Sequence, residues 1–341
     1  MFKIIKRFKF ILSILIVFLF ILFLLSRGVF YKKKDISYGV TFSKKESEDL
    51  GLDWKENYLA ILDDLQVKKI RLSAYWDEVE KEKGIFIWDD LDWQINEAEK
   101  RNTEIILAIG TRLPRWPECH FPDWVKKTNK QEREKEVLNY IKKTIERYKN
   151  KKTIKVWQIE NEPFLAHFGE CPKLDKEFLD KEILLAHKLD SRPILISDSG
   201  ELSLWLPAAK RADIFGTTMY RDTYSQILKK YIHYPIEPGF FRFKKNIASF
   251  FVHPEKWLVI ELQGEPWGPR PFQELSQKER DKTMSYEKFL DIIDFSRKTG
   301  FKEFYLWGVE WWYWEKNVQH DDRFWNKAKE LFDLKYSQKT E

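Results

Sequence analysis

The chain has 341 residues, enough for one large domain or two modest ones with a buried core. Apolar residues make up 43% of it and charged residues 33%, which excludes a mostly disordered chain and a polytopic membrane protein. The formal charge of +6 comes from residues 1–34, which hold eight of the 60 basic residues and no acidic residue. The rest of the chain has 52 basic and 54 acidic residues. We therefore expect no nucleic-acid partner.

Residues 10–25 form an apolar run in which Ser13 is the only polar residue, with cationic clusters on both sides. A helix of this length is about 24 Å long, somewhat short of the ~30 Å hydrocarbon core of a bilayer. We predict a single uncleaved transmembrane helix, with residues 1–34 as a membrane anchor and the rest of the chain on the extracytoplasmic side. The alternative is a cleaved signal peptide and a secreted protein, although no A-x-A-like site follows the run.

Eight short apolar or β-branched runs follow, each with the length of a buried parallel strand. They are residues 36–42, 69–73, 104–110, 156–159, 194–197, 214–217, 257–260 and 303–307. Between them lie stretches with apolar residues three and four apart, as at 54–65, 137–148, 178–186 and 286–293. Eight alternating strands and helices predict a single (β/α)8 TIM barrel over residues 35–334, followed by a polar tail at 335–341.

Several common functional motifs are missing from the sequence. It contains no Gly-rich dinucleotide turn, no Walker motif, no H-E-x-x-H, no C-x-x-C pair and no G-x-S-x-G. Nucleotide-binding, zinc-protease, redox-pair and serine-hydrolase functions therefore have no support. We expect no cofactor and no metal site.

The two cysteines are Cys119 and Cys171, an even number that fits one disulfide in an oxidising compartment. They follow the third and fourth predicted strands, whose loops are neighbours in a barrel. We predict that they form a disulfide at the rim of the barrel. Two separate buried thiols are the alternative.

In a barrel of this kind the chemistry lies in the loops at the carboxyl ends of the strands. The fourth strand leads into Asn161-Glu162-Pro163, and the seventh leads directly into Glu261. A double-displacement glycosidase requires two carboxylates at such places, one to protonate the leaving oxygen and one to attack the anomeric carbon. A single glutamate in so charged a chain is most often a surface residue, but two at strand ends, both with Trp and Pro neighbours, favour an active site.

The run W-Q-I-E-N-E-P at residues 157–163 resembles the Asn-Glu-Pro signature of the clan A retaining glycoside hydrolases. This superfamily includes family-five cellulases and mannanases and family-forty-two β-galactosidases, and the resemblance covers residues 39–314. It implies that Glu162 is the general acid/base and Glu261 the nucleophile. It also implies that Asn161 binds the 2-hydroxyl of the sugar.

The same resemblance extends to further residues. It implies that Arg71 holds the carboxylate of the nucleophile ionised, that Tyr220 contacts the nucleophile, and that Trp307 forms the aromatic floor under the reacting sugar. The ends of strands three and five lack the histidines of many family-five enzymes, so the family stays unassigned. Glu265, four residues after Glu261, is a second candidate for the nucleophile.

Aromatic residues make up 16% of the chain, with 15 tryptophans among them. Trp267 and Trp311 follow the seventh and eighth strands, and we predict that they stack on pyranose rings as substrate-binding residues. The other tryptophans in or near such loops are Trp116, Trp124, Trp312 and Trp314. The alternative for each is that it packs its loop over the barrel.

Together these features predict a retaining glycoside hydrolase that cleaves an O-glycosidic bond, expected to be β, in a carbohydrate substrate. Retention requires the two carboxyl groups to lie ~5–5.5 Å apart. A membrane-tethered transglycosylase is one alternative, because it would share every residue named here. A catalytically silent glycan-binding barrel is another, but it need not keep both glutamates.

Overall fold

The computed structural model describes residues 7, 11–13, 15–17, 36–165 and 168–333. No helix in these ranges has both the length and the apolar character needed to cross a membrane. Most of the predicted anchor at 10–25 and the whole predicted tail at 335–341 lie outside the described residues.

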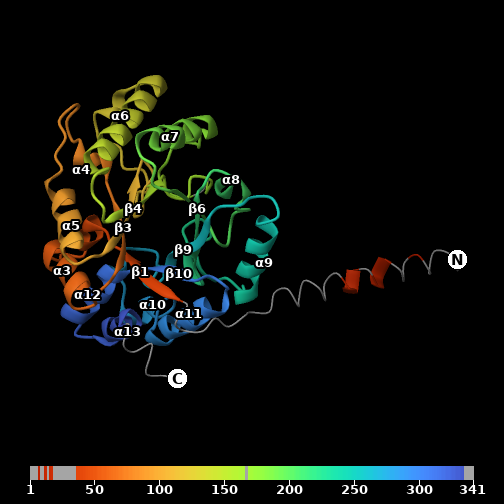
Figure 1. The fold of residues 1–341 in the computed structure, drawn as a ribbon. Coiled ribbons are helices and arrows are strands. Elements are labelled where there is room, and N and C mark those ends of the chain that lie inside the picture. Colours follow the sequence, from red (N-terminus) through yellow and green to blue (C-terminus); the bar gives the residue numbers. More distant parts are fainter. Residues whose placement is uncertain (1–6, 8–10, 14, 18–35, 166–167, 334–341) are drawn as a thin grey trace.

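Eight parallel strands close into a barrel, which confirms the predicted fold (Figure 1). The order around the ring is β1, β10, β9, β6, β5, β4, β3, β2. The bounds are β1 (Ser37–Thr41), β2 (Lys69–Ser73), β3 (Glu104–Ile109), β4 (Ile154–Ile159), β5 (Ile194–Asp198), β6 (Ile214–Met219), β9 (Lys256–Gln263) and β10 (Glu303–Trp307). Because all eight run in parallel, their carboxyl ends meet at one mouth of the barrel.

Helices cover the outside of the barrel (Figure 1). The longer ones are α3 (Trp54–Asp63), α5 (Asp89–Lys100), α6 (Lys130–Tyr148), α7 (Lys176–Leu189), α9 (Pro238–Ala248), α11 (Tyr286–Lys298), α12 (Val309–Asn317) and α13 (Arg323–Phe332). The short ones are α2 (Lys44–Asp49), α4 (Trp76–Val79), α8 (Leu206–Ala209) and α10 (Gln277–Arg280). Where α11 ends, Gly300 has a φ of +85°, which suits the left-handed residue that commonly follows a helix.

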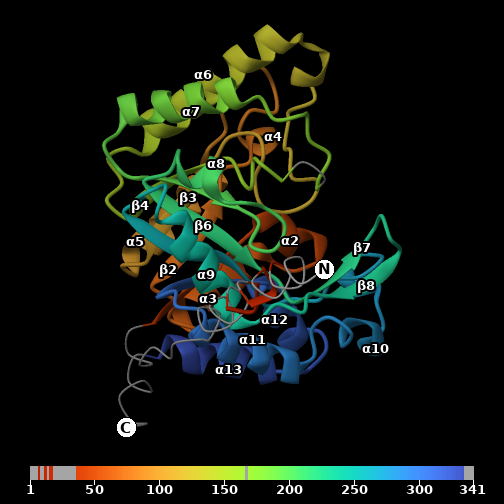
Figure 2. The same cartoon turned by 90° about the vertical axis from the view of Figure 1, so that its right-hand side faces the viewer.

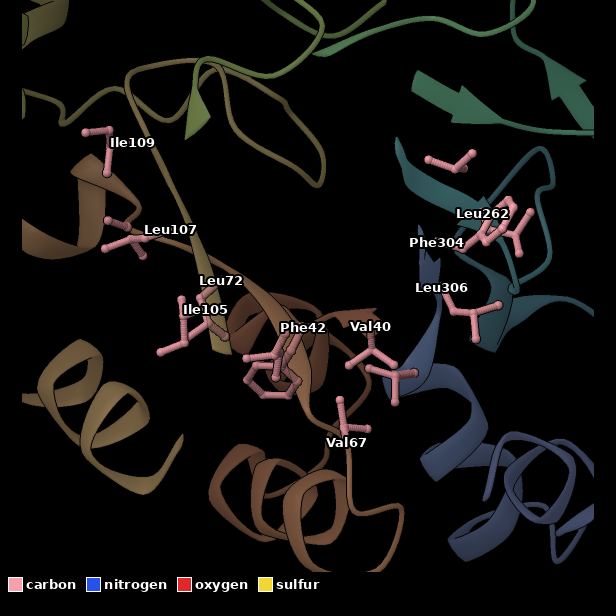
Figure 3. Close-up of a cluster of buried hydrophobic side chains, with 14 of the residues drawn as sticks. Val40, Phe42, Val67, Leu72, Ile105, Leu107, Ile109, Leu262, Phe304 and Leu306 are labelled. Atoms are coloured by element: carbon pink, nitrogen blue, oxygen red, sulfur yellow. The ribbon is translucent and has the colours of Figure 1, made fainter. Parts of the chain in front are cut away.

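The strands separate two apolar layers. Ile105, Leu107 and Ile109 of β3 belong to the large core between barrel and helices, part of which Figure 3 shows. Ile106, between them in sequence, belongs to a second cluster made only of strand residues, which fills the barrel. Alternate residues of a strand point to opposite faces, and here both faces are buried. This explains why the strands read as continuous apolar runs.

Two features of the strands differ from the prediction. A hairpin of β7 (Asp222–Ser225) and β8 (Lys230–His233) projects beside the barrel (Figure 2). Its strands are short and largely polar, so no apolar run marks them. In addition, β9 continues to Gln263, three residues beyond the predicted end, because the polar side chains of Glu261 and Gln263 are buried and hydrogen-bonded within the barrel mouth.

Candidate active site

Glu162 and Glu261 both lie at the mouth of the barrel, with β5 and β6 between their strands. Glu162 follows the end of β4, and Glu261 is the third residue from the end of β9. They are 6% and 3% exposed. Thr218 of β6 links them, because it stands opposite Glu261 in the strand pairing and donates a hydrogen bond to Oε1 of Glu162 at 3.2 Å.

Arg71 on β2 joins three side chains of the site. Its Nη1 donates to Oε1 of Glu261 at 2.7 Å, and its Nη2 donates to Oδ1 of Asn161 at 2.7 Å. Its Nε donates to Oε1 of Gln158 at 2.8 Å. The guanidinium is fully buried, so its charge depends on these partners. The structure therefore brings Arg71, Asn161 and Glu261 together, as the sequence resemblance implied.

The second oxygen of Glu261 is also bound. The hydroxyl of Tyr220 donates to Oε2 of Glu261 at 2.9 Å. Burial, and then the charge of Glu261, raise the pKa of Tyr220 well above its usual value, so the phenol keeps its proton and remains a donor. Each oxygen of Glu261 thus accepts a hydrogen bond from a buried or partly buried donor, which stabilises a negative carboxylate.

The surroundings of Glu162 have the opposite effect. Burial is the largest cause that raises its pKa well above the usual value, followed by the negative charges of Glu261, Glu118 and Asp198. Arg112 opposes these effects and lowers the pKa. Burial and the negative neighbours favour the protonated form of Glu162.

The backbone turns sharply at the end of β4. Glu160 and Glu162 both have positive φ, 57° and 42°, a conformation that costs non-glycine residues on the order of 1–3 kcal/mol. The carboxylate of Glu160 holds this turn by accepting from the backbone N–H groups of Thr111 and Arg112, at 2.8 and 2.5 Å. Gly110 allows the approach, because a Cβ there would lie 2.4 Å from Oε1 of Glu160. The turn directs Glu162 to β6 and Glu160 to the loop after β3.

Glu118 is a further buried carboxyl at the site, and no sequence pattern pointed to it. Nδ2 of Asn161 donates to its Oε2 at 3.3 Å, and Nε of Arg112 lies 3.9 Å from the same oxygen. Burial raises the pKa of Glu118 to about 8. Its φ of 72° is also in the left-handed region, and it is followed directly by Cys119.

The predicted disulfide is confirmed. Cys119 and Cys171 are joined, and their sequence separation is 52. The bond links the loop after β3 to the loop after β4. It therefore fixes the segment that carries Glu118 beside the segment that carries Glu162.

Glu265, the second candidate for the nucleophile, has different partners from Glu261. Its Oε1 accepts from Nη1 of Arg115 at 2.5 Å and from Nε1 of Trp307 at 2.6 Å. Arg71 and the hydroxyl of Tyr220 donate their hydrogen bonds to Glu261 and not to Glu265.

The three predicted substrate-binding tryptophans have different environments. Trp267 is partly buried, and its ring meets that of Tyr220 edge-on, with centroids 5.4 Å apart. Trp307 lies at the end of β10, and the guanidinium of Arg115 covers its ring at 4.1 Å from the centroid. The prediction for Trp311 is wrong: it is 0% exposed on α12 and packs against Phe324, so it is a core residue with no face for a sugar.

Trp116 and Trp267 are connected through Phe168 of the loop after β4. Phe168 lies 5.6 Å from Trp267 and 6.4 Å from Trp116, measured between ring centroids. Trp116 is 63% exposed. Aromatic faces therefore extend from Tyr220, beside Glu261, to the surface. Trp312 and Trp314, like Trp311, are buried in the core.

Within the described ranges, no group of three or more His, Cys, Asp or Glu side chains has the arrangement of a metal site. The prediction of a chain without metal or cofactor rests on the sequence alone.

The model of "Glycosyl hydrolase family 10" matches residues 34–178. The match includes Arg71, Asn161 and Glu162 and ends before Glu261. Among curated proteins, "Beta-galactosidase BgaA" of Clostridium cellulovorans is 24% identical over 230 residues, 59% of this chain and 34% of that protein. The chain therefore spans about a third of the length of this relative.

Solved structures share the fold. Native xylanase 10B from Thermotoga maritima superposes with a TM-score of 0.55 at 14% identity, covering 90% of this chain and 98% of that one. GH5_18 from Streptomyces cattleya, solved in complex with GlcNAc, gives a TM-score of 0.55 at 10% identity, covering 80% and 70%. A beta-glucosidase from Exiguobacterium marinum gives 0.53 at 13% identity, covering 82% and 89%.

Proposed function

We propose that this chain, which is a glycoside hydrolase of clan A, cleaves a β-glycosidic bond with retention of configuration. Glu261 is the nucleophile and Glu162 the general acid/base. The observation that carries this proposal is the contrast between the two carboxyls. Arg71 and Tyr220 donate to Glu261, whereas burial and negative neighbours raise the pKa of Glu162.

The first step forms a covalent intermediate. The carboxylate of Glu261 attacks the anomeric carbon, and the bond between that carbon and the glycosidic oxygen breaks. Glu162 gives its proton to the departing oxygen, so the leaving group is a neutral alcohol. The charge of Glu261 is lost in the ester, and Glu162 becomes a carboxylate.

The second step releases the sugar. Loss of the negative charge of Glu261 lowers the pKa of Glu162, so Glu162 remains a carboxylate and is available to take a proton from the attacking water. The resulting hydroxide adds to the anomeric carbon from the face that the leaving group vacated. The ester bond breaks, Glu261 regains its charge on Arg71, and two inversions give net retention.

Asn161 positions the sugar in this scheme. Its Oδ1 accepts from Arg71, and Nδ2 donates toward Glu118, so the amide is fixed in one orientation between these residues. Nδ2 then offers its remaining hydrogen to the 2-hydroxyl beside the anomeric carbon. The rings of Trp267 and Trp116, which Phe168 of the loop after β4 connects, are proposed to stack on the leaving-group part of the substrate.

The test uses the full chain and a panel of p-nitrophenyl β-glycosides of xylose, glucose, galactose and mannose. We expect release of nitrophenol from at least one of them, and a product whose first anomer by NMR is β. A 2-deoxy-2-fluoro glycoside of the same sugar should label Glu261, and fragmentation of the labelled peptide by mass spectrometry distinguishes Glu261 from Glu265. An α product, or a label on Glu265, contradicts the mechanism.

We further propose that residues 10–25 anchor the enzyme with its barrel on the extracytoplasmic side of a membrane. The disulfide supports this location, because such bonds persist in oxidising compartments. Fractionation of cells followed by protease treatment of intact cells or spheroplasts tests it. The barrel should fractionate with membranes and be cleaved from outside; a soluble cytoplasmic protein contradicts the proposal.

A further inference from the structure

A buried ionic cluster lies at the same mouth of the barrel, and the mechanism above uses none of its members. Arg115 donates to Glu265 at 2.5 Å and to Glu310 at 2.9 Å, and Glu46 lies 3.5 Å from it. Arg115, Glu265 and Glu310 are 6%, 4% and 0% exposed. Burial also raises the pKa of Glu46 to about 8. We call Arg115, Glu46, Glu265 and Glu310 the Arg115 cluster.

The Arg115 cluster joins loops from four strands. Glu46 is on α2, which follows β1, and Arg115 follows β3. Glu265 follows β9, and Glu310 is on α12, which follows β10. In the closed ring β9, β10, β1, β2 and β3 are consecutive. The cluster therefore crosses the mouth above this arc of the barrel.

Close packing holds the Arg115 cluster against the candidate active site. Trp307 lies under the guanidinium of Arg115 and donates from Nε1 to Glu265. Gly308, with a φ of +112°, permits this packing, because a Cβ there would lie 2.5 Å from the Cβ of Glu265. The charge of Glu265 also acts on Tyr220, the residue that donates to Glu261.

The roles proposed for the two glutamates assign the two parts of the substrate to different sides of the site. Glu261 bonds to the sugar that is transferred, so this sugar lies on the side of β9 and β10. Glu162 protonates the oxygen of the leaving group, which lies on the side of β4. The Arg115 cluster extends from the side of the transferred sugar, where Glu265 and Glu310 follow β9 and β10, to Arg115 in the loop after β3. Its charges are buried and paired, so a second sugar could enter there only by separating them.

We infer that the Arg115 cluster closes the site behind the transferred sugar, so that the enzyme removes single sugars from non-reducing ends. The inference rests on the proposed function. It selects oligosaccharides or glycoconjugates with an unsubstituted terminal β-linked sugar over the interior bonds of a polysaccharide. Oε2 of Glu265 and Nε of Arg115 are buried without hydrogen-bond partners among the described residues.

The test compares p-nitrophenyl β-glycosides of one sugar and of its β-linked disaccharide, with the full chain. We expect immediate release of nitrophenol from the monosaccharide glycoside. The disaccharide glycoside should give free monosaccharide first and nitrophenol after a lag. Direct release of the intact disaccharide, with a kcat/KM about tenfold or more above that of the monosaccharide glycoside, overturns the inference. Failure to cleave any glycoside contradicts the proposed function, and this inference falls with it.

Variants test the cluster itself. Arg115→Ala should raise the kcat/KM ratio of the disaccharide to the monosaccharide glycoside by about tenfold, since a second sugar can then bind. Glu46→Ala, at the partly exposed edge, is a milder variant that should move the ratio in the same direction if Arg115→Ala does not fold. Arg147→Ala removes a partly exposed arginine on α6 that pairs with Asp92, outside both the cluster and the active site, and should leave the ratio unchanged. An unchanged ratio in both cluster variants, folded by circular dichroism, overturns the assignment.

Discussion

Arg71 and Glu261 are joined by a hydrogen bond of 2.7 Å between two side chains that are 0% and 3% exposed. The same guanidinium fixes Asn161 through a second bond of 2.7 Å. A buried arginine with three side-chain acceptors uses its planar fork of donors, which a lysine cannot reproduce. Arg71 therefore places a positive charge beside Glu261 and holds Glu261 and Asn161 in fixed positions relative to each other.

This relationship predicts the effect of Arg71→Lys. The variant keeps a positive charge but can no longer donate to Glu261, Asn161 and Gln158 at once. We expect kcat/KM to fall by about 100-fold, equivalent to about 3 kcal/mol, and the melting temperature to fall as well. Steady-state kinetics and thermal melting measure the two effects. Activity near that of the wild type would mean that these contacts do not serve the reaction.

The roles of the two glutamates predict different dependence on the leaving group. Glu162→Ala should lower kcat/KM by about 10²–10⁴ for glycosides with poor leaving groups, because general acid catalysis is lost. For dinitrophenyl glycosides, whose leaving group needs no proton, the loss in the first step should be much smaller. Glu261→Ala should abolish cleavage of both kinds. The control is Glu265→Ala; covalent labelling that persists in Glu261→Ala but vanishes in the control would reverse the assignment.

The pH profile should depend on Glu118. Glu162 must be protonated in the first step, so kcat/KM falls as the pH rises through its pKa. Glu118 has a pKa of about 8, so its negative charge develops on the alkaline side, where it raises the pKa of Glu162; Glu118→Gln removes this charge. We expect the alkaline limb to move to lower pH by about one unit.

Arg112 has the opposite effect to Glu118, because its positive charge lowers the pKa of Glu162. Arg112→Gln should move the alkaline limb to higher pH. Profiles of kcat/KM in the wild type and both variants measure these shifts. Limbs that coincide in all three proteins would show that Glu162 does not govern the alkaline side.

The disulfide predicts a redox-dependent stability. The bond closes a loop of 52 residues, so its loss should cost about 4 kcal/mol by loop-closure entropy. Cys119→Ser with Cys171→Ser should lower the melting temperature, and a reductant should do the same to the wild type but not to the variant. The variant should also be less active at temperatures below its melting temperature, because Glu118 and Glu162 lie on the two loops that the disulfide joins. Equal melting of oxidised and reduced wild type would contradict this.

Two tryptophans should behave in opposite ways. Trp311 is buried against Phe324, so Trp311→Ala should destabilise the fold by ~3–5 kcal/mol. Trp116 is 63% exposed, so Trp116→Ala should leave the melting temperature nearly unchanged and raise KM for oligosaccharides. Melting curves and kinetics on the same preparations distinguish the two effects. A stable Trp311→Ala would contradict its place in the core.

The sequence determined the architecture of this protein. Its eight strands are buried on both faces, so each reads as an apolar run, and the prediction located all eight barrel strands. Glu162 and Glu261 were found because they stand where such runs end. The sequence pattern did not predict the hairpin of β7 and β8, because its two polar strands pair with each other in antiparallel fashion and carry no apolar run.

Tertiary structure alone decided what surrounds these residues. Glu118 and Arg115 lie on an irregular loop, where no periodicity fixes the direction of a side chain. Trp311 and Trp267 both follow barrel strands, yet one is packed in the core and the other stands beside Tyr220. The pKa of Glu162 and the contacts of the Arg115 cluster depend on groups that are distant in sequence and meet only when the eight strands form the barrel.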